Sequence, residues 1–201
     1  PNVKSIERFN EGNRTSKLEE MKIPVAKPYL GVEEAQLAYD TILTNWVTQG
    51  PRVAEFEEKF ARYVGSEYAV AVSNCTTALH LSLIVAGIGP GDEVICANIS
   101  HIYLYEGGGV AQNSGVSMRL LEGDRGRITA AQVLANINAD DAHYPHTTLV
   151  SLENTMNKGG GACYSLDELK AIREVCTQKG LKLHCDGARL MNAVVAKGID
   201  T

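Results

Sequence analysis

The sequence predicts an α/β fold of three layers, in which a mainly parallel sheet is covered by helices on both faces. Short apolar segments with strand character alternate with longer segments whose apolar residues recur at helical spacing. Turns rich in glycine and small polar residues separate these segments, and the chain shows no internal repeat. Alternating strands and helices are typical of parallel sheets, because parallel neighbours need a long crossover connection that usually contains a helix.

The composition limits the class of protein further. The chain has 201 residues, of which 44% are hydrophobic and 21% charged, and this suits a globular body. A formal net charge of -5 does not favour nucleic acid or anionic lipid as a partner. No apolar run approaches the roughly 20 residues that span a bilayer, and no secretory signal opens the chain. We therefore expect a soluble, cytoplasmic protein that binds neither nucleic acid nor membrane.

The chain is divided into three parts by its patterning. Residues 1–20 are polar and lack a hydrophobic period, so we expect a leader, with Met21 as the natural start. Residues 21–66 form an N-terminal helical segment, in which Ile23 to Tyr29 is extended. Apolar spacing predicts one helix over 32–45 and a second from Pro51 to Gly65, with proline in its first turn and glycine as its stop.

The third part, residues 67–201, is the α/β domain. Strands are predicted from short apolar runs at 68–72, 93–96, 116–121, 149–152 and 181–185. Helices are predicted at 78–86, 129–137 and 165–179. Ser165 and Glu168 have the spacing of a capping box, and Gly180 suits the end of the same helix.

A polar turn, Ser73 to Thr77, joins the first predicted strand of this domain to its helix. The turn places free backbone N–H groups and the hydroxyls of Thr76 and Thr77 at the positive end of a helix, which favours a phosphate dianion. The glycine patterns of nucleoside triphosphate and dinucleotide sites are missing, so a phosphomonoester fits better. Simple N-capping of the helix explains the same residues and remains the alternative.

The second candidate cluster directly follows the last predicted strand. Asp186 comes at the carboxyl end of that strand, where ligands of parallel sheets lie, and could keep a heterocyclic nitrogen protonated. Arg189, three residues further on, suits bidentate pairing with the carboxylate of an amino acid. An N-capping aspartate with a surface arginine is the alternative.

Two loop histidines are further candidates. His101 follows the strand at 93–96 by a short loop, so its ring can reach the same sheet edge and lie against a flat cofactor. His143 precedes the strand at 149–152 and could act as an acid or base. A solvated loop histidine is the alternative for both.

The five cysteines do not form a recognisable framework. Their number is odd, their spacing is wide, and no Cys-x-x-Cys pair occurs. We expect buried, reduced thiols, with neither disulfides nor a metal site.

Two sets of motifs resemble two enzyme groups. Residues from about 23 to 95 resemble nucleotide-sugar aminotransferases of the DegT type, through Ile23-Pro24-Val25-Ala26-Lys27-Pro28, Trp46-Val47-Thr48-Gln49-Gly50-Pro51, Glu55-Phe56-Glu57, the segment Val72 to Leu81 and Gly89-Pro90-Gly91-Asp92-Glu93-Val94-Ile95. Residues from about 100 to 201 resemble low-specificity threonine aldolase of the β-eliminating lyase group, through the segments Ser100 to Gly109, Gly123 to Gly126, Leu152 to Thr155 and His184 to Ala193. The join lies near residues 93–100.

Both groups are fold type I enzymes that use pyridoxal 5'-phosphate (PLP), and they form homodimers or homotetramers. The resemblance implies that the chain folds as a truncated large domain of this type and takes a small amino acid as substrate. It also implies the site residues: Cys75, Thr76 and Thr77 at the cofactor phosphate, His101 stacked on the ring, Asp186 at the pyridine nitrogen, Arg189 at the substrate carboxylate and His143 near the substrate hydroxyl.

The sequence departs from the aldolase pattern at three points. Nothing matches the aldolases' opening Arg-Ser-Asp-Thr segment, and Met156 stands where they often carry histidine. Both groups place the lysine that binds PLP about two dozen or more residues after the aspartate, whereas this chain ends fifteen residues after Asp186. Lys197 comes too early to be that lysine, so we expect the chain alone to be inactive.

The function that the resemblance implies is therefore that of a PLP-dependent lyase, which cleaves L-threonine or L-allo-threonine to glycine and acetaldehyde. A DegT-type aminotransferase acting on a keto-sugar nucleotide is the alternative. A non-catalytic hybrid fragment is a third, favoured by the change of motif at residues 93–100 and the missing lysine.

Overall fold

The computed structural model describes residues 28–198, which form two compact units, 28–56 and 57–198. The predicted leader, and most of the segment after it that is predicted to be extended, lie outside the described residues. The first unit contains α2 (Val32–Leu43), and α3 (Pro51–Val64) crosses the boundary between the units. Both helices confirm the apolar spacing of the sequence, and α3 starts at its proline as expected.

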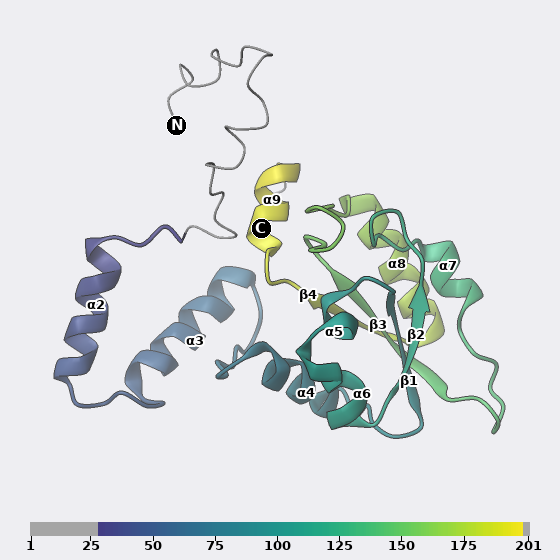
Figure 1. Ribbon diagram of the computed structural model, residues 1–201, viewed down its shortest axis with the longest axis horizontal. Helices are drawn as coiled ribbons and strands as arrows, with labels where there is room; N and C mark the ends of the chain where they lie inside the picture. The colour runs from purple at the N-terminus through teal and green to yellow at the C-terminus, as the bar shows by residue number, and fades with distance from the viewer. Residues whose placement is uncertain (1–27, 199–201) are drawn as a thin grey trace, which may run out of the picture. The chain divides into compact units, whose positions relative to one another are not determined.

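The second unit contains a four-stranded sheet, shown in Figure 1. Its strands are β1 (Asp92–Ala97), β2 (Ser117–Leu121), β3 (His146–Glu153) and β4 (Lys182–Asp186). They pair in the order β2-β1-β3-β4, and every pairing is parallel. The predicted parallel α/β sheet is thus confirmed, and four of the five expected strands lie where their apolar runs occur.

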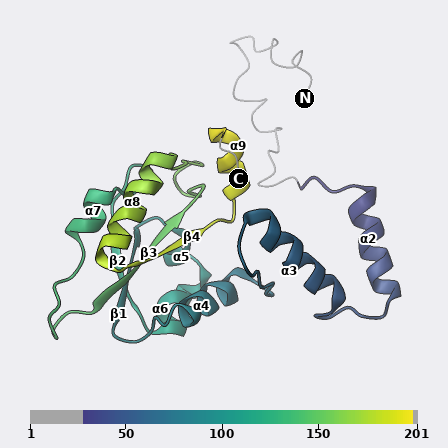
Figure 2. The same cartoon turned by 180° about the vertical axis from the view of Figure 1, so that it is seen from behind.

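Helices cover both faces of this sheet (Figures 1 and 2). On one face, α4 (Cys75–Val85) and α6 (Gly109–Ser114) pack against the alternate side chains Val94 and Cys96 of β1. On the other face, α7 (Ala130–Ala135) and α8 (Leu166–Lys179) enclose the remaining apolar residues of the strand. The alternation follows from strand geometry, in which successive side chains point to opposite faces.

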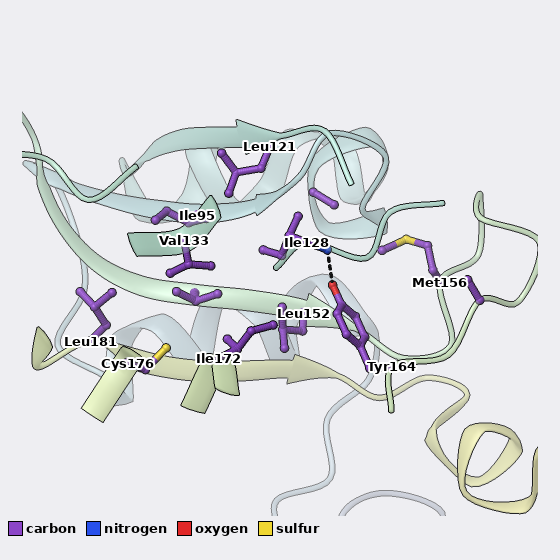
Figure 3. Close-up of a cluster of buried hydrophobic side chains, with 13 residues drawn as sticks. Ile95, Leu121, Ile128, Val133, Leu152, Met156, Tyr164, Ile172, Cys176 and Leu181 are labelled. Atoms are coloured by element: carbon purple, nitrogen blue, oxygen red, sulfur yellow. Dashed lines mark hydrogen bonds between the residues drawn. The ribbon is translucent and has the colours of Figure 1, made fainter. Parts of the chain in front are cut away.

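The core on the α7 and α8 side contains one aromatic ring, that of Tyr164, which lies toward one end of the cluster in Figure 3. Tyr164 is 1% exposed and lies among the side chains of Ile128, Leu152 and Met156. Its hydroxyl accepts a hydrogen bond of 2.9 Å from the backbone N–H of Ile128. The ring therefore buries apolar area while its polar end pairs with a buried backbone group of the loop before α7.

The ends of α8 confirm the local signals of the sequence. Ser165 Oγ accepts from the Glu168 N–H at 3.2 Å, and the Glu168 carboxylate accepts from the Ser165 N–H at 2.6 Å. Gly180 ends the helix in the left-handed region with a φ of 69°, which glycine adopts without the strain a Cβ would bring.

The structure corrects the segment before α4. Residues 68–72 form neither strand nor helix, and Tyr68 and Val70 are more than 70% exposed. A strand needs a neighbour to pair with, and none of the described strands lies beside this segment. The helix also starts at Cys75 rather than residue 78, because Asn74 Oδ1 accepts from the Thr77 N–H at 2.8 Å and acts as its N-cap.

Between β1 and β3, further helices of the structure differ from those predicted. The segment that joins β1 to β2 contains three short helical pieces that the sequence did not predict: α5 (His101–Leu104), η2 (Glu106–Gly108) and α6. The helix predicted over 129–137 is shorter and ends at Ala135. Glycines at 107 to 109 break the helical spacing of this region, so no continuous period was visible.

The cysteines are all free, but only two of them are buried. Cys96 lies in β1 and Cys176 in α8, as expected for packing residues. Cys75, Cys163 and Cys185 are not buried, which corrects the expectation for these three, because they lie at a helix start, in a loop and on the edge strand β4. Among residues 28–198, no helix has the length and apolar character required to cross a membrane.

Candidate active site

The candidate residues gather at the edge of the sheet where the strands end. Glu153 and Asp186 are the last residues of β3 and β4 and are paired in register. The helix α4 runs opposite to the strands, since the ammonium of Lys182, at the start of β4, bonds to the carbonyl of Ala86 just after α4. The first turn of α4 therefore lies at the same edge as the strand ends.

Asp186 is a carboxylate held at this edge by the turn that follows β4. It is 8% exposed, and one of its oxygens accepts from the Ala188 N–H at 3.3 Å. Its own carbonyl accepts from the Asn154 N–H at 3.0 Å, which ties the ends of β3 and β4 together. Asp186 thus keeps a nearly buried negative group in a defined place.

Arg189 lies in the turn between β4 and α9 (Leu190–Lys197) and points back across the end of β3. Its Nη2 is 2.9 Å from Glu153 Oε1 and 3.2 Å from the carbonyl oxygen of Thr155. Its Nε contacts both oxygens of Thr155 at 3.3 and 3.4 Å. The guanidinium is therefore held on one side, although the side chain is 37% exposed.

His101 begins α5 immediately after the loop that leaves β1. Its backbone N–H donates to Glu153 Oε2 at 2.8 Å, and its ring stacks on Tyr105 with 4.6 Å between ring centroids. Its Nδ1 is 3.2 Å from Glu106 Oε1. One face of the imidazole is thus supported by Tyr105, and its tautomer and orientation are tied to a carboxylate.

The first turn of α4 joins this cluster through Glu106. The hydroxyl of Thr76 donates to Glu106 Oε2, so this carboxylate bridges α4 and the ring of His101. Burial raises the pKa of the Cys75 thiol, and the negative charges of Glu106 and Asp186 raise it further. Cys75 therefore lies close enough to both carboxylates to sense them, and the turn, the histidine and the aspartate share one site.

His143 is the predicted residue that the structure does not bring to this cluster. It lies before β3, at the opposite edge of the sheet, and its side chain is 89% exposed. Its Nδ1 and its N–H both contact Asp141 Oδ1, at 2.7 and 2.9 Å. A strand rises about 3.3 Å per residue, so the length of β3 separates His143 from the site by roughly 25 Å within one chain.

The structure also adds residues that sequence reasoning missed. Glu106 and Tyr105 contact the ring of His101. The ammonium of Lys158 lies 5.5 Å from the ring centroid of Tyr105. Glu153 contacts both His101 and Arg189. Glu153 lies 52 residues from His101 and 36 from Arg189. The sequence offered one signal for Glu153: this glutamate directly ends a long apolar run. A charge buried at such a place needs partners.

Solved structures define the class of protein to which this fold belongs. The aminotransferase TlmJ of Streptoalloteichus hindustanus is 30% identical and superposes with a TM-score of 0.64, over 83% of this chain and 42% of that chain. The threonine aldolase of Leishmania major superposes with a TM-score of 0.70 at 21% identity, over 83% of this chain and 50% of that one, and shares the fold. The sheet and its helices are those of the large domain of fold type I PLP enzymes.

Within this class, the chain belongs to the beta-eliminating lyase family, whose profile matches residues 32–201. Among curated relatives, the probable low-specificity L-threonine aldolase 2 of Arabidopsis thaliana is 36% identical over 152 residues, 74% of this chain and 43% of the relative. The spore coat polysaccharide biosynthesis protein SpsC of Bacillus subtilis is 46% identical over 78 residues, 39% of this chain and 20% of that protein. The chain thus spans less than half the length of these relatives.

The residues at the strand ends fit the cofactor of this PLP-dependent family. A nearly buried carboxylate at Asp186 offers a partner for a protonated ring nitrogen, and the His101 imidazole, supported from behind by Tyr105, offers a flat surface. The first turn of α4 presents N–H groups that have no partner inside the helix. All three features lie on one sheet edge, which is the place where open α/β sheets bind ligands.

Proposed function

We propose that the chain carries the cofactor and substrate-carboxylate residues of a PLP-dependent lyase of the threonine aldolase type. Its reaction would cleave L-threonine or L-allo-threonine to glycine and acetaldehyde. The observation that carries the proposal is the meeting of Asp186, Arg189 and His101 at one sheet edge, joined by contacts of Glu153 to two of them. We further propose that the protein acts in the cytoplasm as a homodimer or homotetramer.

Each group of cofactor residues would bind a different part of PLP. Cys75, Thr76 and Thr77 would hold the phosphate at the start of α4, where the helix dipole favours an anion. His101 would cover one face of the ring, and Asp186 would keep the pyridine nitrogen protonated by its negative charge. Bound PLP supplies an electron sink for the carbanion that forms when a bond to the substrate α-carbon breaks.

The substrate would be positioned by its own charged and polar groups. Arg189 would pair with the carboxylate, which orients the amino acid relative to the ring face. His143 would take the proton of the β-hydroxyl as a general base. Because His143 lies at the opposite edge of its own sheet, this role requires a second copy of the chain to supply it.

The proposal is tested on the purified chain by measuring PLP binding through absorbance and fluorescence. Acetaldehyde release from L-threonine is measured on a chain extended at its carboxyl end to include a lysine that binds PLP. Cofactor binding should be weakened by Asp186→Asn at least tenfold, an effect of roughly 1.4 kcal/mol. The matched control is Asp167→Asn on α8, in the helix packed against the face opposite α4. Equal binding by wild type and D186N would overturn the proposed cofactor site.

A DegT-type aminotransferase remains the second candidate, because relatives of that kind match a shorter part of the chain more closely. SpsC is 46% identical over 78 residues, and the UDP-4-amino-4-deoxy-L-arabinose--oxoglutarate aminotransferase of Shewanella sediminis is 38% identical over 80. Conversion of bound PLP to pyridoxamine phosphate by L-glutamate, without acetaldehyde from L-threonine, would favour this reading. Failure to bind the cofactor at all would favour the non-catalytic fragment.

A further inference from the structure

The carboxylate of Glu153 is the hydrogen-bond acceptor that connects several residues of the site. It is 1% exposed and accepts hydrogen bonds from three donors. Oε2 accepts from the His101 N–H at 2.8 Å, while Oε1 accepts from the Asn157 N–H at 2.8 Å and from Arg189 Nη2 at 2.9 Å. A buried carboxylate is stable only when its charge is paired and its oxygens are bonded, and both conditions are met here.

These contacts decide which part of Arg189 remains available. Glu153 and Thr155 take up Nη2 and Nε, the two nitrogens along one side of the guanidinium. Among the described residues, no hydrogen bond or ion pair engages Nη1. The arginine is therefore braced through one side, with the outer nitrogen left for another acceptor.

We propose that Glu153 is a positioning residue, which braces Arg189 so that its Nη1 end receives the carboxylate of an amino acid substrate. The inference rests on the proposed function, since it concerns how the substrate carboxylate is bound. Glu153 itself touches neither substrate nor cofactor. By also fixing the His101 N–H, the same carboxylate sets the spacing between the carboxylate-binding arginine and the ring-covering histidine.

The chemistry of the site requires an anion at residue 153. All three partners donate, so the amide that Glu153→Gln introduces would turn its NH2 toward at least one of them. The loss of the negative charge also leaves Arg189 without its ion-pair partner. Arg189 is then free to adopt other orientations, and the substrate carboxylate loses a prearranged partner.

The experiment compares two probes that bind without a lysine, using the whole chain. Pyridoxamine 5'-phosphate carries the ring and phosphate, and N-(5'-phosphopyridoxyl)-L-threonine adds the amino acid with its carboxylate. The ratio of their dissociation constants reports the carboxylate contact and cancels any general loss of cofactor affinity. In the wild type we expect the conjugate to bind at least about tenfold tighter, and in E153Q we expect most of that ratio to disappear.

Two comparisons separate positioning from general stability. Glu93→Gln is the matched control, because Glu93 is 4% exposed, also accepts from several donors, and lies at the opposite edge of the sheet at the start of β1. It should lower the melting temperature and leave the ratio unchanged. Arg189→Lys should lower the ratio by itself, and adding E153Q to R189K should lower it no further, because Glu153 acts through the guanidinium.

Each outcome decides a separate question. A wild type that binds neither probe overturns the proposed function, whereas a folded E153Q protein with an unchanged ratio overturns the inference alone. If E153Q is unfolded at the assay temperature, Glu153→Asp replaces it: the charge is kept but the carboxylate moves back by one methylene. A reduced ratio in E153D then supports the inference, and a wild-type ratio overturns it.

Discussion

The hydroxyl of Tyr164 offers a sharp test of how the core on the α8 side is held together. In Figure 3 the hydroxyl meets the backbone N–H of Ile128, at a distance of 2.9 Å, and both residues are 1% exposed. Tyr164→Phe removes the oxygen and keeps the ring, so packing changes little. The change therefore removes the two hydrogen bonds of the hydroxyl to the loop that precedes α7: the one accepted from the Ile128 N–H, and a longer one of 3.4 Å donated to the Gly126 carbonyl.

The expected loss of stability in Y164F depends on the polar groups that lose their partner. After Y164F, the Ile128 N–H is buried without an acceptor, and water cannot reach it because the site is closed. An orphaned buried donor costs about 1 to 3 kcal/mol, more than the net value of a typical hydrogen bond. We expect the free energy of unfolding at pH 7 to fall by about 2 kcal/mol, measured by urea denaturation.

Alkaline pH provides an independent check on the same group. Burial raises the pKa of Tyr164 to about 12, well above the ordinary value of 10.0. Between these pH values the unfolded chain loses the phenol proton and the folded chain keeps it, so the wild type loses stability as the pH rises. The loss reaches about 2 to 3 kcal/mol by pH 12. Y164F has no such loss, so the gap between the two proteins should close.

Tyr144→Phe is the matched control, since Tyr144 is 57% exposed and lies in the loop before β3. It should change the free energy of unfolding by less than about 0.5 kcal/mol at either pH. Equal stability of Y164F and Y144F at pH 7 would mean that the Tyr164 hydroxyl does not stabilise the core. A constant gap between wild type and Y164F from pH 9 to pH 12 would mean that folding does not raise the pKa of this phenol.

Three further predictions concern α8. Ser165→Ala removes the N-cap and should cost about 1 kcal/mol in urea denaturation; no change would mean that the capping box contributes nothing. The hydrogen bond from the Ser165 N–H lowers the pKa of Glu168 below 4.5. The free energy of unfolding should therefore fall more in acid for the wild type than for Glu168→Gln, and an equal fall in both proteins would contradict this. Ile172→Ala, at a fully buried site, should cost about 2 to 5 kcal/mol, against under about 1 for exposed Leu166→Ala.

The elements that the sequence predicted well are those whose signal is local. The run at 93–96 became β1 and the capping box at Ser165 became the start of α8, since both depend on neighbours within a few residues. The run at 68–72 has the same apolar character, but it has no paired neighbour among the described strands. Apolar character predicts a strand only where another strand supplies the hydrogen bonds, and that information is not local.

Much of the candidate site was also predictable, because parallel sheets place ligands at the ends of their strands. Asp186 ends a strand and His101 follows one by a short loop, and the structure brings both to one edge. His143 precedes its strand, and the same rule places it at the other edge, away from them. The position of His143 before its strand could thus be read from the sequence. Its resemblance to an aldolase histidine nevertheless suggested a place in the site.

The amino-acid pattern is sufficient to predict the class of fold, the helices and strands with clear periods, and the residues that end or follow each strand. The contacts by which Glu153 joins His101 to Arg189, and Glu106 joins Thr76 to the same histidine, arise only in the folded chain. The contacts of His101 and Arg189 with Glu153, and of Thr76 with Glu106, link residues 30 to 52 positions apart. They depend on strand order, register and the crossing of α4 over the sheet, which hydrophobic periodicity does not encode because it reports only which face of an element is buried.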